Sequence, residues 1–193
     1  LKIQELSDFG RPSQYHYGGL GRFSPTILRY AKFALDLEFF FPEIGGLAVC
    51  EIGVGFGGQS IALNKFFGNS KFSFFDLPEV NKLAQICVQA LTENLDLQLL
   101  NGRTPPVHSS DLVISNYAFS EMARSVQEAY LHNVLLKSPR GFMAFNSLAM
   151  EQLGGFDAYT LAEKLPQSIV IPEEPASNRD NVIIVWGSTQ FHS

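Results

Sequence analysis

The chain has 193 residues, 46% of them hydrophobic and 17% charged, a composition that excludes a disordered polymer. Its formal net charge of −5 and pI of about 5.3 exclude the basic surface expected of a nucleic-acid-binding protein. The length suits one domain, and no apolar run of about 18 residues predicts a membrane span.

Cys50 and Cys87 fall in segments that we expect to be buried, without the spacing of metal ligands. Two small buried thiols are typical of a reducing compartment, and no signal peptide is visible. We therefore predict a cytoplasmic protein without a metal site. The sequence leaves a homo-oligomer open, and because the chain starts at Leu1 it also leaves open the original N-terminus.

The first 24 residues are punctuated by glycines and predict an irregular arm or lid, with His16 between two tyrosines. Ser24 followed by Pro25 is typical of a helix start, because Ser caps the first turn and Pro suits its first position. We expect this leading helix and its linker to occupy residues 25–46, ahead of a core at 47–193.

From residue 47 onwards, short apolar runs alternate with amphipathic segments. Strands are predicted at 47–52, 72–75, 97–100, 112–115, 142–146, 168–171 and 182–186, and helices at 59–67, 78–92, 121–136 and 156–165. This alternation predicts a parallel sheet covered by helices on both faces. The last two strands are joined by only about ten residues, too few for a helical crossover, so we expect the final strand to be antiparallel.

The most informative segment is 51–58, with the sequence Glu-Ile-Gly-Val-Gly-Phe-Gly-Gly between a strand and a helix. Glycines there let the backbone turn tightly and approach a ligand. The pattern also satisfies the dinucleotide fingerprint. However, Glu51 would repel a diphosphate, whereas it suits the ammonium and sulfonium of S-adenosylmethionine. A tight turn without a ligand is the alternative interpretation.

Asp76 ends the second predicted strand, 18 residues beyond Gly58. A carboxylate at this point can accept hydrogen bonds from two ribose hydroxyls, as it does in both NAD enzymes and methyltransferases. The alternative is an N-cap, because Pro78 and Glu79 form a good helix start.

Several segments resemble class I S-adenosylmethionine-dependent methyltransferases, and in particular the bacterial sugar O-methyltransferases. Segment 51–59 resembles the first motif of the class, and 75–80 resembles an Asp-Leu-Pro stretch common in O-methyltransferases. Segments 24–30, 109–121 and 181–187 fit the sugar family, so the likeness extends over most of residues 9–187. It implies a Rossmann-like α/β fold with a mostly parallel seven-stranded sheet, an antiparallel last strand and helices on both faces.

The resemblance also implies where the cofactor lies. Glu51, Gly53 and Gly55 would follow its methionine and ribose, Asn101 would contact adenine, and Ser115 and Asn116 would face the methyl group. Many relatives have Asp where this chain has Asn101. The complete set of expected cofactor contacts is Glu51, Gly53, Gly55, Gly57, Asp76, Leu77, Asn101, Ser115 and Asn116.

Methyl transfer to a sugar hydroxyl benefits from a general base, because the hydroxyl is weakly acidic. The catalytic candidates are Glu121 and His16, with Glu151 as a third. Glu121 could instead be a first-turn helix carboxylate beside a Ser120 cap, and His16 could belong to an exposed tail. We assign no catalytic role to His108, His132 or His192.

The sequence thus predicts an S-adenosylmethionine-dependent O-methyltransferase acting on a sugar hydroxyl of a polysaccharide or glycosylated metabolite. Its expected partner is a small-molecule or glycan acceptor. An NAD-dependent oxidoreductase and a non-catalytic cofactor-binding scaffold are the alternatives. N-methylation is disfavoured, because the fourth strand ends in Ser-Asn-Tyr-Ala rather than in an Asn-Pro-Pro-Tyr type of motif.

Overall fold

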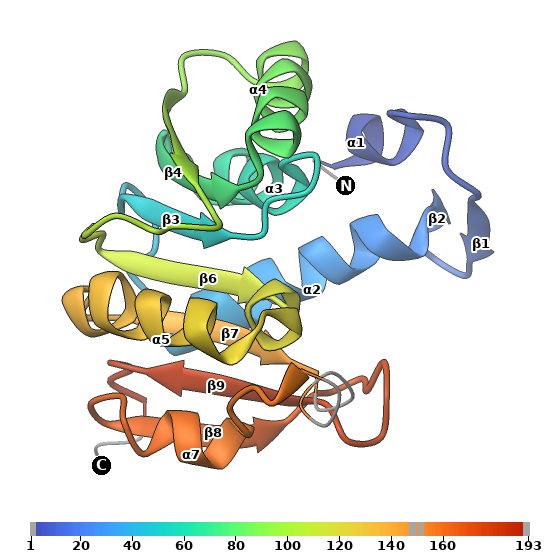
Figure 1. The fold of residues 1–193 in the computed structure, drawn as a ribbon. Helices are drawn as coiled ribbons and strands as arrows, with labels where there is room; N and C mark the ends of the chain where they lie inside the picture. The colour runs from blue at the N-terminus through green and yellow to red at the C-terminus, as the bar shows by residue number, and fades with distance from the viewer. Residues whose placement is uncertain (1–2, 147–149, 151–152, 191–193) are drawn as a thin grey trace.

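Seven strands form one sheet in the order β5-β4-β3-β6-β7-β9-β8, and two more form a separate hairpin, β1-β2 (Figure 1). The computed structural model describes residues 3–146, 150 and 153–190. The strands are β1 (Tyr15–Tyr17), β2 (Gly21–Phe23), β3 (Val49–Ile52), β4 (Lys71–Asp76), β5 (Asp96–Asn101), β6 (Leu112–Asn116), β7 (Gly141–Phe145), β8 (Ser168–Pro172) and β9 (Val182–Trp186). The α-helices are α1 (Gln4–Asp8), α2 (Pro25–Phe40), α3 (Gly58–Phe67), α4 (Pro78–Leu91), α5 (Arg124–Asn133) and α7 (Ala158–Ala162), and the 3₁₀ helices are η1 (Ala118–Glu121) and η2 (Leu135–Lys137).

The direction of each strand depends on the length of the link that joins it to the strand before it. Strands β3 to β7 pair in parallel, while β9 runs antiparallel to both β7 and β8. The short link between β8 and β9 cannot cross the sheet, so the chain turns back beside the strand it has just left. The expected antiparallel last strand is confirmed.

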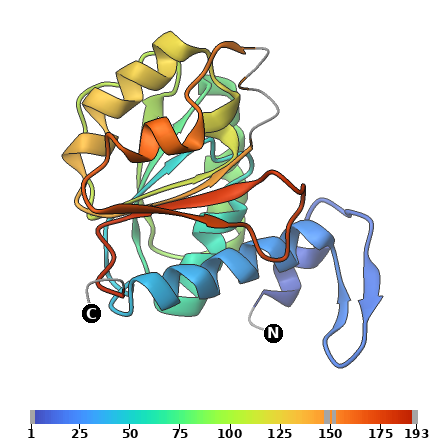
Figure 2. The same cartoon turned by 90° about the horizontal axis from the view of Figure 1, so that it is seen from below.

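Helices cover both faces of the sheet. One apolar cluster packs α2, α3 and α4 onto the face that includes Phe72, Phe74 and Phe142. A second packs α5 and α7 onto the opposite face around Phe145 and Trp186. Figure 2 shows α2 on one side of the sheet and α5 with α7 on the other. The strands β6, β7 and β9 are largely buried on both sides, which explains their mainly apolar sequences.

The N-terminal segment differs from the irregular arm expected from sequence. It contains α1 and the β1-β2 hairpin. Ile3 and Leu6 are buried in the core, and the Ser24 amide donates to the Ser7 hydroxyl at 2.9 Å. The glycines that predicted an irregular arm include Gly21, whose φ of +109° lies outside the regions open to most residues. The predicted cap is confirmed, since the Ser24 side chain accepts from the Ile27 amide.

The helix predicted over 121–136 is broken into η1, α5 and η2, because Met122 and Ala123 adopt extended backbone conformations between the first two. The helix predicted over 156–165 is confined to α7. Within the described part of the chain, no helix is long and apolar enough to cross a bilayer.

Candidate functional site

The glycine loop joins β3 to α3 at the carboxyl edge of the sheet. Gly53 has a φ of +77°, and its amide donates to the Phe75 carbonyl at 2.8 Å. A Cβ on Gly53 would lie 2.0 Å from the Cβ of Ala118, so this glycine lets η1 pack against the loop. Gly55 has a φ of +54°, and a Cβ there would meet no atom within 4 Å. The loop therefore leaves backbone open to a ligand at Gly55.

These two glycines should respond differently to alanine. Gly53→Ala adds both a left-handed backbone penalty and a clash with Ala118. We expect it to lower the free energy of unfolding by about 3 kcal/mol. Gly55→Ala adds only the backbone penalty, roughly 1–2 kcal/mol. Urea unfolding measures both values, and an equal loss in the two variants would contradict the assigned packing.

Glu51 lies in β3 with only 3% of its surface exposed. The Ser60 hydroxyl of α3 donates a hydrogen bond to its carboxylate. Burial, and then the nearby Asp76 carboxylate, raise the pKa of Glu51 from 4.5 to about 8, although the Ser60 hydrogen bond opposes the rise. The ion pairs found in the described part of the chain do not include Glu51. A cationic ligand beside this carboxyl group would therefore stabilise its charged form.

Asp76 ends β4 and faces the same loop. One carboxylate oxygen accepts from the Leu77 amide at 2.7 Å, and the other accepts from the Gly55 amide at 3.3 Å. The alternative N-cap role is wrong, because Leu77 is the N-cap residue of α4 and no side chain caps that helix end. The half-buried carboxylate thus lies against the open glycine and retains lone pairs for a ligand.

A cavity of about 230 Å³ begins at Asp76. Its lining residues are Asp76, Leu77, Gly102, Arg103, Met122, Ala123 and Val126. Gly102 is needed there, because a Cβ would lie 2.9 Å from the Cα of Asp76. The predicted contact Asn101 is exposed beside it, with its side-chain oxygen accepting from the Arg103 amide. The cavity is large enough for a flat heterocycle.

Sequence reasoning found Asp76 and Leu77 in this cavity and missed the rest of its lining. Gly102, directly after the third strand of the core, is a signal that could have found part of it, since an isolated glycine at a strand end indicates a close backbone approach. Met122 and Ala123 carry no such signal. They reach the cavity because the chain leaves η1 in an extended conformation.

The other predicted cofactor residues have protein partners. Gly57 is the N-cap of α3, and a Cβ there would lie 2.5 Å from Val88 of α4. Ser115 is fully buried; its hydroxyl donates to the Ile52 carbonyl at 3.0 Å and accepts from the Phe119 amide at 3.1 Å. It therefore ties β6 to β3 directly below the glycine loop.

Asn116, the last residue of β6, is linked to α2 by hydrogen bonds that the sequence did not reveal. Its side-chain amide donates to Gln59 at 3.2 Å, and the Gln59 amide donates to the Tyr30 carbonyl at 3.2 Å. Burial and the Glu51 charge raise the pKa of the Tyr30 phenol to about 12. Tyr30 thus stays protonated beside the loop at neutral pH.

The catalytic candidates are not brought together. Glu121 is exposed at the end of η1 and directly precedes Met122 of the cavity. Its alternative as a first-turn carboxylate of the predicted helix is wrong, because α5 begins at Arg124 and Ser120 instead accepts from the Asn146 amide. His16 is exposed in β1, opposite Arg22 in β2. Glu151 and His192 lie outside the described residues.

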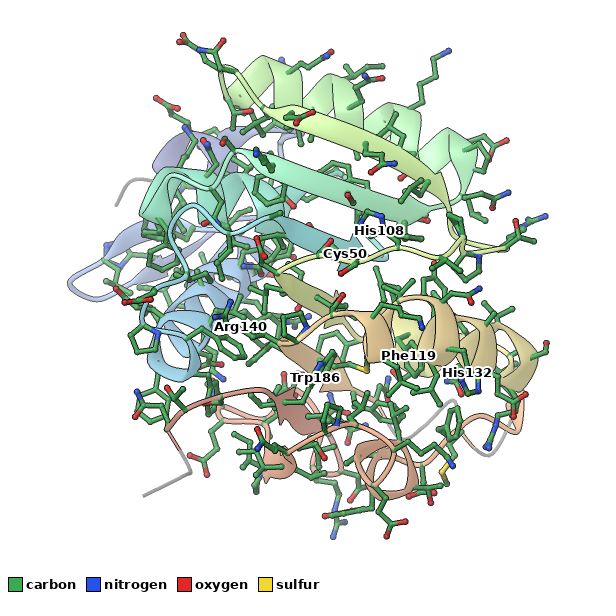
Figure 3. The ribbon with its side chains drawn as sticks, turned by 90° about the vertical axis from the view of Figure 1, so that its left-hand side faces the viewer. Cys50, His108, Phe119, His132, Arg140 and Trp186 are labelled. Carbon is green, nitrogen blue, oxygen red and sulfur yellow. The ribbon has the colours of Figure 1, made fainter. Side chains whose placement is uncertain are left out.

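The other two histidines lie away from the loop. His108 is half-buried with its ring 5.5 Å from that of Phe75, near the amino ends of the strands, whereas His132 is exposed on α5 (Figure 3). Cys50 and Cys87 are buried and free. No group of three His, Cys, Asp or Glu able to hold a metal ion occurs among the residues that the structure describes.

A second cavity, of about 330 Å³, lies at the same edge of the sheet. The residues that line it are Tyr17, Pro25, Leu28, Arg29, Lys32, Phe33, Glu173, Pro175, Ala176 and Ser177. Tyr117 borders it, because its phenol donates to Glu173 and contacts the Ser177 hydroxyl at 2.9 Å. Sequence reasoning missed this cavity, whose walls come from three separate segments.

Solved structures resemble this fold at low sequence identity. Thermoplasma acidophilum 1320 aligns over 86% of this chain and 96% of its own, with 15% identity and a TM-score of 0.56. A variant of MtNAS in complex with S-adenosylmethionine aligns over 82% of this chain and 62% of its own, with 14% identity and a TM-score of 0.58. Magnesium protoporphyrin IX methyltransferase from Synechocystis with bound SAH aligns over 83% and 81%, with 14% identity and a TM-score of 0.60.

At these identities the likeness concerns the fold alone. The predicted fold class is confirmed: a Rossmann-like α/β sheet of the class I methyltransferase type, with an antiparallel last strand. No protein-family model matches the chain, and no curated protein matches its sequence.

Proposed function

We propose that the chain binds S-adenosylmethionine and transfers its methyl group to an oxygen acceptor. The observation that carries this proposal is the buried Glu51 carboxyl group beside a glycine loop that is open at Gly55. An ammonium or sulfonium beside this carboxyl group stabilises its charged form and is attracted to it, whereas a diphosphate would disfavour that form. The neighbours crystallised with S-adenosylmethionine or its demethylated product SAH support the same choice.

The residues around the loop fit the parts of this cofactor. Asp76 can accept hydrogen bonds from the two ribose hydroxyls, and the cavity beyond Leu77 and Gly102 suits an adenine ring. Glu51, Gly53 and Gly55 would follow the methionine and ribose, and Gly57 is a further proposed contact. Ser115 and Asn116, at the end of β6, would lie near the methyl group.

When bound, S-adenosylmethionine supplies an electrophilic methyl group whose sulfur leaves without charge. The chain's own contribution is then mainly to position the acceptor oxygen in line and to exclude water. We propose a sugar hydroxyl as the acceptor, on the resemblance of segments 24–30, 109–121 and 181–187 to sugar O-methyltransferases. The arm of residues 1–24 is proposed to close over the bound acceptor.

Titration calorimetry tests the cofactor choice. We expect S-adenosylmethionine and SAH to bind with dissociation constants in the micromolar range and NAD⁺ not to bind. Tight NAD⁺ binding without S-adenosylmethionine binding would instead favour an oxidoreductase. Cofactor binding without methyl transfer to any glycan would favour a scaffold.

Glu121 and His16 are the proposed general bases. Replacing a true base should lower kcat by about 10²–10⁴-fold while leaving the affinity for S-adenosylmethionine unchanged. We expect this loss in Glu121→Gln or in His16→Ala, measured by transfer of labelled methyl groups to a glycan acceptor. Glu128→Gln on the exposed face of α5 is the matched control. Full activity in both variants would remove both residues as bases.

A further inference from the structure

The second cavity is formed where three distant segments meet. The first turns of α2 provide one wall, Tyr17 of β1 provides another, and the loop between β8 and β9 provides the third. Figure 2 shows this loop reaching the half of α2 that leads back to the hairpin. The cavity is therefore held between the sheet domain and the N-terminal segment, on the side where β6 ends.

Much of the cavity wall is apolar. Pro25, Leu28 and Phe33 come from α2, and Pro175 and Ala176 come from the β8-β9 loop. Apolar side chains of this kind can pack against the face of a sugar or other ring.

The carboxylate of Glu173 is already fully engaged. It accepts hydrogen bonds from the Tyr117 hydroxyl, the Ser177 amide and hydroxyl, and the Asn181 side-chain amide. Although burial acts in the opposite direction, these hydrogen bonds hold the pKa of Glu173 below its usual value. Because only 3% of Glu173 is exposed, it shapes the loop rather than presenting a free charge to the cavity.

The two cations of the cavity differ in their partners. Lys32 forms an ion pair with Asp36 one turn along α2. Arg29 is exposed, with its guanidinium 5.7 Å from the centre of the Tyr117 ring, and no carboxylate of the described residues lies within ion-pair distance of it. The positive end of the α2 dipole lies at the same place. Of these two cations, Arg29 is therefore the one available to bind an anionic group of a ligand.

The cavity is also connected to the proposed methyl site. Tyr117 directly follows Asn116, its hydroxyl binds two cavity residues, and its ring lies under Arg29. A ligand in the cavity would therefore have one end at Arg29 and the other towards the end of β6.

We propose that this cavity binds the methyl acceptor and that the acceptor carries an anionic group, a carboxylate or a phosphate, held by Arg29. The inference rests on the proposed function for the meaning of the site, but its test measures binding alone. A planar guanidinium with five donors recognises both anions through paired hydrogen bonds. The apolar wall then packs against the ring that bears the hydroxyl.

Three probes of similar size test this inference: glucuronic acid, glucose 6-phosphate and uncharged glucose. Their binding to the full chain, saturated with SAH, is followed by the chemical shifts of backbone amides. We expect at least one anionic probe to bind at least tenfold more tightly than glucose, with shifts at Tyr117 and the β8-β9 loop. The stronger of the two anionic probes identifies carboxylate or phosphate as the natural group.

Arg29→Gln should weaken the preferred anionic probe about tenfold or more, because a charge-assisted hydrogen bond is lost. Arg179→Gln is the matched control, since Arg179 lies in the same loop but does not line the cavity. Equal affinity for glucose and for both anions, or an Arg29→Gln variant that binds as the wild type does, would overturn the inference. If the wild-type chain does not bind SAH, the proposed function is rejected instead. Failure of the anion-site inference and failure of the proposed function are therefore distinguishable.

Discussion

Replacing Glu51 with glutamine is expected to make the protein more stable at pH 8 and to weaken cofactor binding at the same time. The folded-state pKa of Glu51, about 8, lies above its usual 4.5. Between those values the folded chain holds a proton that the unfolded chain has released, so the free energy of unfolding falls as pH rises. A neutral glutamine removes this loss and can still accept from Ser60.

The expected gain at pH 8 is about 1–3 kcal/mol, which corresponds to roughly 3–10 °C in Tm for a chain of this size. At pH 5, where Glu51 is protonated in the folded state, the variant and the wild type should differ little. Thermal unfolding at the two pH values measures the effect. Glu38→Gln, the same change at an exposed position of α2, serves as the control. A variant that is less stable at pH 8 would contradict the assigned environment of Glu51.

Binding should change in the opposite direction. If a cationic cofactor prefers the charged carboxylate, wild-type affinity for S-adenosylmethionine rises with pH by up to about tenfold per pH unit below pH 8. We expect Glu51→Gln to bind about tenfold or more weakly at pH 8 and to approach the wild type at pH 6. The ligand's own titration cancels in the ratio of the two affinities, so a pH-independent ratio from calorimetry would exclude Glu51 as the partner of the positive charge.

Asp76→Ala is expected to reduce the affinity for S-adenosylmethionine and SAH about 100-fold. Two charge-assisted hydrogen bonds to ribose hydroxyls would be lost, at roughly 1.5–3 kcal/mol each before compensation by water. The change should cost only about 1 kcal/mol in stability, because the Leu77 and Gly55 amides lose their acceptor at a half-buried edge.

Asp96→Ala is the matched control for this variant. Asp96 lies at the opposite end of the same pair of strands, where it faces Lys71, whereas Asp76 faces Asn101. We expect its cofactor affinity to equal that of the wild type. An unchanged affinity in Asp76→Ala, or an equal loss in both variants, would show that the ribose does not lie at the end of β4.

Much of the fold could be predicted because the central strands of the sheet are buried on both faces. Strands such as β7 and β9 are continuous apolar runs, which predict buried strands but not their order in the sheet. The glycine loop and Asp76 could be found because left-handed backbone demands glycine and because the acidic residue follows the loop at a characteristic spacing. The break in the helix at Met122 and Ala123 could not be predicted, because neither residue disfavours a helix locally and the extended turn is set by tertiary packing.

The second cavity could not be predicted from the sequence, because its walls depend on contacts between distant segments. Its key hydrogen bonds join Tyr117 to Glu173 and Ser177, more than fifty residues later in the sequence. No local pattern in the sequence indicates such a pairing. The hairpin could not be predicted for a different reason, because its strands are three residues long and too short for a periodic signal.

A crystal structure of the chain soaked with SAH would show where the cofactor binds. We expect the ribose hydroxyls to be hydrogen-bonded to Asp76, the ammonium to lie near Glu51, and the adenine to lie in the cavity lined by Leu77 and Gly102. Density for SAH elsewhere, or a crevice at the glycine loop that accepts the diphosphate of NAD⁺ and excludes SAH, would contradict it.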